Sequence, residues 1–523
     1  MPLFRAEERR TIESLARVAD ANPFSPEFVE GERAILGPGH APAGAVWSLR
    51  TEPGAQSSGL ARMGVVAERL ARDARARLLR RPPATADELR LYASLVTFTL
   101  YQRYAEPLHE IHLDPERARR RVACYRSFRR DLDHFLVAGR LPLPQRVDPA
   151  HLFACYFQVR RAFHLIHRHI VGGSAPAARL RAAVWQSIFT HDMRRYWRSL
   201  HDRMHDVTTL ISGPSGTGKE LVARAIGLSR YVPFDAERET FTATLDGAFH
   251  ALNVSALSPT LIESELFGHR KGAFTGAVQD RVGWLEACPR FGAVLLDEVG
   301  EIDGAIQVKL LRVLQTREFS RIGETVPRTF EGKLIAATNR DLAKEMRAGR
   351  FREDLYYRLC SDLVDTPSLR EQIADAPGEL RNLVVFVSER VVGPAGAAEL
   401  ADEVLACVER DLGPDYPWPG NVRELEQCVR NVLVRKEYRP PAAAAHSSAD
   451  DLAGKLGEGS LTAEEMLRRY CTMVYARTGS YQETARRLQL DRRTVKRHVD
   501  PELLARLTHP PASKLVSRSR GTD

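Results

Sequence analysis

The sequence predicts a multidomain chain with an α-helical N-terminal region, an α/β core with a helical lid, and an all-α C-terminal domain. Helical periodicity without alternating strands marks the first region, and short apolar strands that alternate with helices mark the second. Three short helical stretches mark the third. At 523 residues the chain has room for about three or four domains. The expected segments are a helical region (1–184), the α/β core (185–437, with its lid at about 367–437), a flexible linker (438–459), a small helical domain (460–508) and a disordered tail (509–523).

The composition is that of a soluble, folded protein, with 44% hydrophobic and 27% charged residues. No apolar run is long enough to span a membrane, and no signal peptide is recognisable. The seven cysteines are scattered without CxxC spacing, which argues against a disulfide framework and predicts a cytoplasmic location. The net charge of +9 permits nucleic-acid binding, but an arginine-rich composition is also typical of GC-rich genomes.

Capping signals divide the N-terminal region into helices. Thr85-Ala86-Asp87-Glu88 is a capping box, and Asp114-Pro115 and Asp148-Pro149 each place an N-cap before a proline. The helices that begin at these signals are expected to end near Tyr104, Val137 and Ile170. Because strands and helices do not alternate here, a phosphoacceptor receiver domain is not predicted. By its position the region should regulate the α/β core, although the sequence names no signal.

Three histidines close to the end of this region invite a metal-site interpretation. His164 and His167 share a helix face and His169 is close by, but no acidic or cysteine ligand stands at matching spacing. We therefore interpret them as amphipathic or surface histidines.

A glycine-rich loop lies between a β-branched run, 207–211, and a helical stretch, 221–226. In this setting glycines let backbone N–H groups face a polyphosphate, and Lys219 reaches the terminal phosphates. Glu220 stands where the general pattern has a Ser or Thr that binds magnesium. The alternative is a glycine turn before a packed helix. The candidate phosphate-binding residues are Gly213, Pro214, Ser215, Gly216, Thr217, Gly218, Lys219 and Glu220.

A carboxylate pair, Asp297-Glu298, directly follows the buried-strand candidate 294–296. At the end of a strand, about 80 residues after a phosphate loop, such a pair suits magnesium-nucleotide hydrolysis. Asp297 is expected to organise the metal ion, and Glu298 to orient or deprotonate the attacking water.

Two asparagines also end strand candidates. Asn253 follows 249–252, and Asn339 follows the strand 334–337 with its Thr338. Both are expected at the edge of the sheet where the phosphates lie, either sensing the γ-phosphate or holding a water. The alternative for each is a turn-forming asparagine.

Three arginines are candidates to reach a nucleotide. Arg352 and Arg358 are interpreted either as arginine fingers for a neighbouring subunit or as partners of the local acids Glu353 and Asp354. Arg423, in the first turn of a helix after residue 420, is expected to act from a small helical lid.

The segment 272–277 has no role that the chemistry of a metabolic enzyme would explain. Glycines flank Phe274-Thr275, which predicts a mobile hairpin with an exposed aromatic side chain. An exposed Phe is costly unless it meets a partner, and its alternative is a buried turn anchor. The residues of this segment are Gly272, Ala273, Phe274, Thr275, Gly276 and Ala277.

After a tether at 439–448, the tail predicts helices from Thr462 to about Arg477, from Tyr481 to Leu488 and from Arg492 to Val499. Two short helices joined by a tight turn indicate a helix-turn-helix. Residues 461–523 hold 13 Lys and Arg against 7 Asp and Glu, a net +6, which favours DNA. A helical dimerisation bundle is the alternative. The candidate DNA contacts are Arg492, Arg493, Thr494, Lys496 and Arg497.

At these residues the chain resembles the NtrC-type activators of sigma-54 RNA polymerase, that is, the bacterial enhancer-binding proteins. The resemblance covers the AAA+ domain at about 190–437 and a Fis-type tail at 461–500. It implies that Glu220 is regular in the loop and that 272–277 contacts sigma-54. It assigns Walker B to Asp297-Glu298, and the remaining implied roles are a coupling partner of Glu298 (Asn253), sensor I (Thr338-Asn339), trans arginine fingers (Arg352, Arg358) and sensor II (Arg423).

The resemblance implies a sigma-54-dependent regulator that binds upstream double-stranded DNA and hydrolyses ATP with Mg²⁺ bound at Asp297. A ring, usually a hexamer in the family, would remodel closed promoter complexes of the sigma-54 holoenzyme into open ones. A dimer is the candidate inactive state, and no membrane is involved. Two other classes stay open: a DNA-binding repressor without turnover, and an AAA+ remodeller of other proteins.

Overall fold

The computed structural model describes residues 2–37, 58–80, 85–137, 147–440, 461–501 and 503–504. The linker expected at 438–459 lies outside the described residues from 441 onward, as does the expected tail 509–523. The chain divides into two compact units, Met1–Lys436 and Glu437–Asp523.

The N-terminal region is helical, as predicted, and the capping box at Thr85 is present. One helix is longer than expected, because α4 continues past Tyr104, through Pro107, to Leu113. The long helix expected after Asp114 is instead broken in two, since the chain turns extended at Arg120. The helices are α1 (Ala6–Asp20), α2 (Pro26–Leu36), α3 (Ser58–Arg80), α4 (Ala86–Leu113), α5 (Pro115–Arg119), α6 (Cys124–Leu132), α7 (Pro149–His169) and α8 (Ala175–Phe189).

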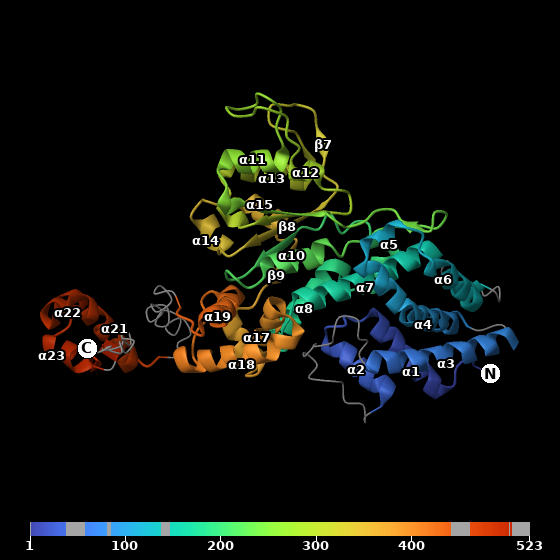
Figure 1. Ribbon diagram of the computed structural model, residues 1–523, viewed down its shortest axis with the longest axis horizontal. Helices are drawn as coiled ribbons and strands as arrows, with labels where there is room; N and C mark the ends of the chain where they lie inside the picture. Colours follow the sequence, from blue (N-terminus) through green and yellow to red (C-terminus); the bar gives the residue numbers. More distant parts are fainter. Residues whose placement is uncertain are drawn as a thin grey trace, which may run out of the picture. The chain divides into compact units, whose positions relative to one another are not determined.

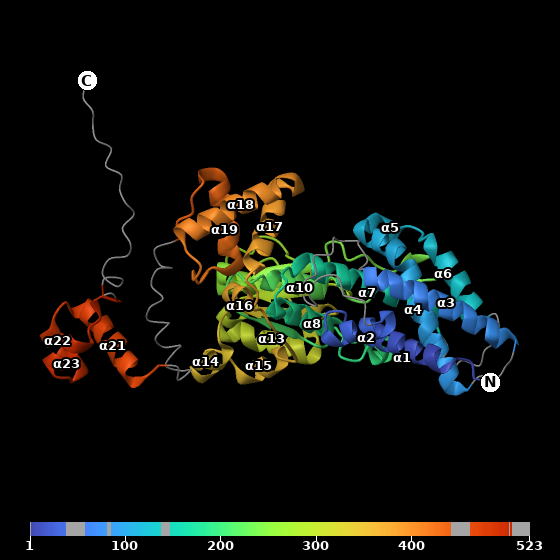
Figure 2. The ribbon, with the colours of Figure 1, turned by 90° about the horizontal axis from the view of Figure 1, so that it is seen from below.

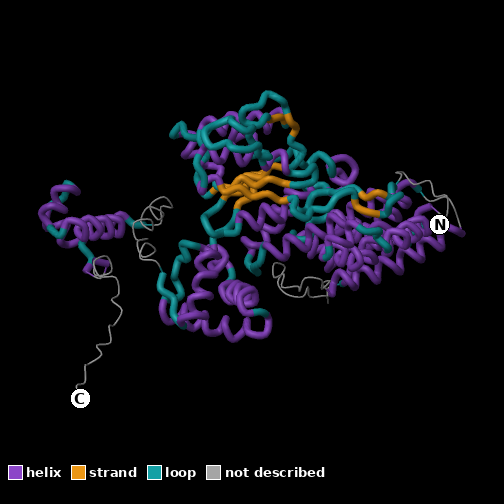
Figure 3. Tube along the Cα trace, turned by 45° about the horizontal axis from the view of Figure 1, so that its top comes forward, coloured by secondary structure: helices purple, strands orange, loops and turns teal. Residues whose placement is uncertain are grey.

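The centre of the first unit is a parallel five-stranded sheet in the order β4-β5-β8-β1-β9. Figure 3 shows the strands bundled between helices. The apolar runs that predicted strands supply the buried centre of the sheet, where Val294, Leu295 and Leu296 are fully buried. The strands are β1 (Thr209–Ser212), β4 (Phe249–Asn253), β5 (Ala293–Asp297), β8 (Lys333–Thr338) and β9 (Asp362–Asp365), and two small antiparallel pairs are β2 (Phe234–Asp235) with β3 (Thr240–Phe241) and β6 (Glu318–Phe319) with β7 (Arg328–Thr329).

Alternate residues of each strand serve opposite faces of the sheet, as the period of two requires. Leu295 and Ile335 pack with α7, α8 and α10, whereas Leu296 and Leu334 pack with the helices of the other face. These helices flank the sheet in Figure 1. They are α10 (Lys219–Gly227) on the first side and α11 (Pro259–Phe267), α12 (Trp284–Ala287), α13 (Gly304–Thr316), α14 (Leu342–Arg347) and α15 (Glu353–Leu359) on the second.

Helix α8 belongs to the core of the NTPase sheet. Its Val184, Trp185 and Phe189 are buried in the same cluster as Ile211 and Val222. The boundary expected between residues 184 and 185 therefore falls inside a helix that covers the sheet.

The lid follows β9 and is helical, as expected for about 367–437. Its helices are α16 (Leu369–Asp375), α17 (Glu379–Val392), α18 (Pro394–Asp411) and α19 (Asn421–Arg435). Seen from below in Figure 2, α17, α18 and α19 stand together beside the sheet.

The second unit contains the three helices expected in the tail, α21 (Ala463–Thr478), α22 (Tyr481–Leu488) and α23 (Arg492–His498). Thr462 and Glu465 form the capping box of α21. A short turn with Gln489 in the left-handed region joins α22 to α23. Cys471, Ala485 and Val495 form the small core.

All seven cysteines are free thiols. Within the described part of the chain, no helix is both long and apolar enough to cross a membrane.

Candidate nucleotide site and client loop

The candidate catalytic residues meet at the carboxyl edge of the sheet. In the strand register Asn253 lies opposite Asp297, and Ser212, just before the glycine loop, lies opposite Thr338. Ligands of parallel sheets bind at this edge, because the loops that leave the strands converge there.

The glycine loop runs from β1 into the first turn of α10, as the sequence predicts. Gly213, Gly216 and Gly218 have φ of 144°, 80° and 88°, which glycine adopts without strain. Lys219 is buried, and its Nζ donates to the carbonyls of Gly213 at 2.9 Å and Pro214 at 3.1 Å. The lysine therefore folds back over its own loop, where a phosphate oxygen would replace these carbonyls.

Two of these glycines also let other elements approach closely. A Cβ on Gly213 would lie 2.1 Å from Oγ1 of Thr366, and a Cβ on Gly216 would lie 2.2 Å from the carbonyl oxygen of Gly420. The loop is thus held between the end of β9 and the start of the last lid helix, and any side chain at either glycine would push these elements apart.

Asp297 is partly buried and has a like charge, Glu298, as its neighbour. Burial raises the pKa of Asp297, the neighbouring Glu298 raises it further, and Lys219 lowers it. Burial lowers the pKa of Lys219, and Glu298 and Asp297 counteract this. The three groups are therefore electrostatically coupled at one edge, where a bound cation would stabilise both carboxylates.

Glu298 adopts a left-handed backbone, with φ 59° and ψ 43°. Such a conformation is strained for a residue with a side chain, and strained residues collect at functional sites. Its Oε2 accepts a hydrogen bond from the backbone N–H of Asn339 at 3.1 Å. The structure thus connects Glu298 to the expected sensor I segment.

Asn253 makes a different contact from the one implied by the resemblance. Its Oδ1 accepts from the backbone N–H and the hydroxyl of Ser255, at 3.0 and 2.7 Å. Asn253 lies opposite Asp297 in the strand register, but in this conformation its side chain caps the next turn.

Glu220 is exposed and pairs with Arg224 at 3.0 Å, one turn along α10. The side chain is thus held on the outer face of the helix. A Ser or Thr side chain at this position carries no charge and could not form this ion pair.

Sequence reasoning missed the pocket beside the loop. It lies between the end of α7, the loop and the lid, and it brings apolar side chains to Thr217 and Gly218. No motif marks these positions, because they come from three distant segments. They include His169, Ile170 and Val171 before α8, and Phe386, Val387 and Arg390 of α17.

The lid touches the glycine loop through two side chains of α19. Arg423 donates to Oγ of Ser215 at 3.2 Å, and Asn421 donates to the carbonyl oxygen of Ser215 at 2.9 Å. The predicted lid arginine is therefore adjacent to the phosphate loop.

A buried lid carboxylate binds the segment before α8. Glu379 is fully buried and accepts from the backbone N–H groups of Gly173 at 2.7 Å and Ser174 at 3.3 Å. Asp375 accepts from the N–H of Ala175 at 2.8 Å. The lid is thus joined both to the phosphate loop and to the N-terminal side of the pocket.

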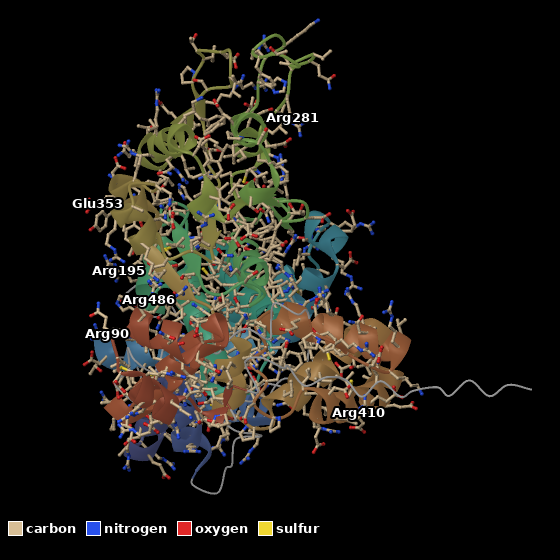
Figure 4. All side chains as sticks on the ribbon, turned by 90° about the vertical axis from the view of Figure 1, so that its left-hand side faces the viewer. Arg90, Arg195, Arg281, Glu353, Arg410 and Arg486 are labelled. Atoms are coloured by element: carbon tan, nitrogen blue, oxygen red, sulfur yellow. The ribbon has the colours of Figure 1, made fainter. Side chains whose placement is uncertain are left out.

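The two expected arginine fingers lie on α15 or at its start. Arg352 pairs with Asp354 at 2.8 Å, which is the local pairing that the sequence left open. Arg358 is exposed and has no acidic partner within the described residues. Glu353, between them in sequence, stands at the margin of the molecule in Figure 4.

The segment 272–277 lies between α11 and α12 and extends away from the sheet (Figure 1). Its base is closed by an ion pair of Arg270 with Asp280 at 2.6 Å, and Arg281, labelled in Figure 4, lies just beyond. Phe274 is half-buried, because its ring packs edge-on against His269 at 4.9 Å between centroids. Thr275 is exposed at the tip. The aromatic side chain is therefore less exposed than the sequence suggested.

The candidate DNA contacts lie on one short helix. Arg492, Arg493, Lys496 and Arg497 of α23 are exposed, while Val495 between them is fully buried. None of the four pairs with an acid among the residues that the structure describes. The helix therefore presents a basic face.

Within the described ranges, no group of three or more His, Cys, Asp or Glu residues forms a metal site of its own. His164 is buried and packs against His109 and His112, at 5.1 and 4.9 Å between ring centroids. His164 is therefore a buried histidine, and the surface interpretation is wrong for this residue. A magnesium ion at Asp297 would need further ligands from a nucleotide and water, and the desolvated carboxylate pair suits such an ion.

Comparison with known proteins finds similarity over part of the chain. A family model described as the sigma-54 interaction domain matches residues 189–364. The chain is 40% identical over 299 residues to the transcriptional regulatory protein ZraR of Klebsiella oxytoca, covering 55% of this chain and 62% of ZraR. It is 44% identical over 230 residues to the Nif-specific regulatory protein of Azotobacter vinelandii, covering 44% of this chain and 40% of that protein. The matches therefore span less than two thirds of either relative.

A solved structure, NtrX from Brucella abortus, aligns with 73% of this chain and 75% of its own, at 23% identity and a TM-score of 0.38.

Proposed function

We propose that this chain, a member of the NtrC-type family of sigma-54-dependent regulators, hydrolyses ATP to remodel sigma-54 RNA polymerase at promoters. The observation that best supports this proposal is the carboxyl edge of the sheet. There Lys219, Asp297 and Glu298 interact on one side of a glycine loop that the lid touches. A sigma-54 interaction domain provides the link from this site to its client.

The residues at the edge divide the chemistry between them. Lys219 and the loop N–H groups hold the phosphates, and Arg423 reaches the same loop from the lid. Glu298 orients the attacking water and accepts its proton, while the N–H of Asn339 fixes the position of its carboxylate. The adenine ring of the nucleotide would lie against the apolar side of the pocket, near Ile170 and Val171.

Asp297, the deeper carboxylate, would hold Mg²⁺ together with the nucleotide. The ion, when bound, neutralises charge on the transferred phosphoryl group.

Turnover requires a neighbouring copy, with Arg358 and Arg352 as its contribution. Arg358 is exposed and unpaired with any described acid, so it is available to a partner subunit. Arg352 must first leave Asp354, and because this ion pair is exposed to solvent its loss costs little. A hexameric ring is the assembly we expect, by analogy with the family.

The segment 272–277 contacts sigma-54, the protein on which the ATPase acts. It stands on a base fixed by Arg270 and Asp280, with Thr275 at its tip. Movement of Asn253 from Ser255 toward Glu298 would connect the nucleotide state to this segment through α11. The basic helix α23 would bind upstream DNA in the major groove.

The experiment is an ATPase assay on the full chain beside Lys219→Ala, with Lys271→Ala as an exposed-lysine control. The rate of ATP hydrolysis per subunit should depend on magnesium and should rise with protein concentration. It should vanish in Lys219→Ala and persist in Lys271→Ala. Hydrolysis that survives Lys219→Ala would refute the site, and a wild-type chain without hydrolysis would favour a DNA-binding repressor.

A further inference from the structure

A small hairpin of the NTPase unit is buried in the N-terminal helices. The hairpin consists of β2, β3 and the turn between them. Phe234 lies 4.5 Å from Tyr125 and 4.9 Å from Phe153, and Phe241 lies 4.2 Å from Phe157, between ring centroids. Both hairpin phenylalanines are 6% exposed, so the contact is a shared core and not a surface touch.

The tip of this hairpin inserts a carboxylate among arginines. Glu239 has a φ of 55°, and its side chain is only 12% exposed. It pairs with Arg126 at 2.7 Å and more closely with Arg121, and its backbone carbonyl accepts from the N–H of Val122 at 2.8 Å. The contact lies at the break between α5 and α6, where residues 120–122 run beside the tip.

A pocket of about 280 Å³ opens next to the glutamate. Its walls are Tyr125, Arg126, Arg129 and Arg130 of α6, with Glu239 and Asp133 as the acidic members. Residues 119–130 contain six arginines and no acid. Arg129 and Arg130 are exposed and pair with no acid in the described part of the chain, so their guanidinium groups are available in this pocket.

Arginine clusters bind carboxylates and phosphates through paired charge-assisted hydrogen bonds. Glu239 already shows this chemistry with Arg121 and Arg126. An anion in the pocket would gain Arg129 and Arg130, and it would compete with Glu239 for Arg126. Asp133 opposes binding, whereas the three arginines of the pocket together favour a multivalent anion over a single carboxylate.

We propose that Arg126, Arg129 and Arg130 form a binding site for a small multivalent anion, carboxylate or phosphate, in which Glu239 is the internal competitor. Occupancy loosens the hairpin tip from α6. Because the hairpin lies in the chain between α10, which carries Lys219, and β4, which carries Asn253, the site is placed to report an anionic effector to the nucleotide site.

Calorimetric titration of the full chain with citrate and with inorganic pyrophosphate tests the site. The Arg129→Ala/Arg130→Ala double variant should bind at least about tenfold more weakly, since two charge-assisted contacts are lost. Arg10→Ala, an exposed arginine of α1, is the matched control. Glu239→Gln should bind more tightly than the wild type, because the variant lacks the internal competitor for Arg126.

Pyrophosphate also suits the phosphate loop, so both titrations are repeated in Lys219→Ala. Binding that persists there belongs to the arginine pocket, and this result is independent of whether the chain hydrolyses ATP. Citrate binding alone assigns a carboxylate site, and pyrophosphate binding alone assigns a phosphate site. Amide hydrogen exchange should speed up at 234–241 when the anion binds. Absence of binding by both probes, or equal binding by the wild type and the double variant, overturns the proposal.

Discussion

Glu379 offers a quantitative test of how the lid is connected to the nucleotide pocket. This fully buried carboxylate accepts from the N–H groups of Gly173 and Ser174, which lie just beyond the pocket residues Ile170 and Val171. Glu379 also interacts electrostatically with Arg181. Burial lowers the pKa of Arg181 to about 10, and the negative charge of Glu379 counteracts this shift. Glu379→Gln keeps the shape but removes the charge and one acceptor.

The expected loss of nucleotide affinity follows from the two hydrogen bonds that Glu379 accepts. A hydrogen bond to a charged group contributes about 1.5–3 kcal/mol. The amide oxygen of Gln can retain the shorter bond to Gly173, so the variant loses about one such bond. At about 1.4 kcal/mol for each tenfold change, nucleotide affinity should fall at least about tenfold and at most about 150-fold.

The assay is titration of a fluorescent ATP analogue, with urea unfolding measured alongside. Glu399→Gln, an exposed glutamate on α18, is the control and should match the wild type. If Glu379→Gln binds nucleotide within about twofold of the wild type while remaining folded, the lid is not coupled to the pocket through this carboxylate.

The client loop, the trans arginine and the buried histidines each give a further prediction. Thr275→Ala should keep ATP hydrolysis but abolish promoter opening, because the tip lies far from Glu298; equal loss of both activities would contradict the division of labour. Arg358→Ala should lose turnover with its thermal unfolding unchanged, and turnover that persists in dilute, monomeric protein would exclude a trans finger. Burial lowers the pKa of His164 to about 4 and that of His167 to about 3, so the unfolded chain binds more protons below about pH 6.5. The free energy of unfolding should therefore drop as pH falls from about 6.5 toward 4, by up to about 1.4 kcal/mol per pH unit for each histidine; urea unfolding at several pH values measures this slope, and a flat profile would show that these histidines are not buried.

The parts of the site that are contiguous in sequence were predictable. The glycine loop, the pair Asp297-Glu298 and the strand ends at 253 and 338 each come after an apolar run, and parallel strands bring such ends to one edge. The left-handed backbone of Glu298 was not predictable, because no glycine or asparagine marks it.

Features made by distant segments escaped sequence reasoning. The pocket residues 169–171 join Phe386 and Arg390 only through folding of the lid. The hairpin at 234–241 has strands of two residues each. Such strands are too short to show an alternation of apolar and polar residues in the sequence. The same hairpin explains why the helix expected to reach Val137 breaks near Arg120. Tertiary contact with Glu239 overrides the local helical preference there.

We propose that ATP hydrolysis by this chain opens sigma-54 promoters. The most direct measurement is open-complex formation by sigma-54 holoenzyme on supercoiled promoter DNA, detected by permanganate footprinting. The full chain would be tested with ATP, with a non-hydrolysable analogue and as Glu298→Gln. We predict open complexes only with the wild-type chain and ATP. A chain that hydrolyses ATP but opens no sigma-54 promoter would contradict this claim and show that the ATPase acts on another client.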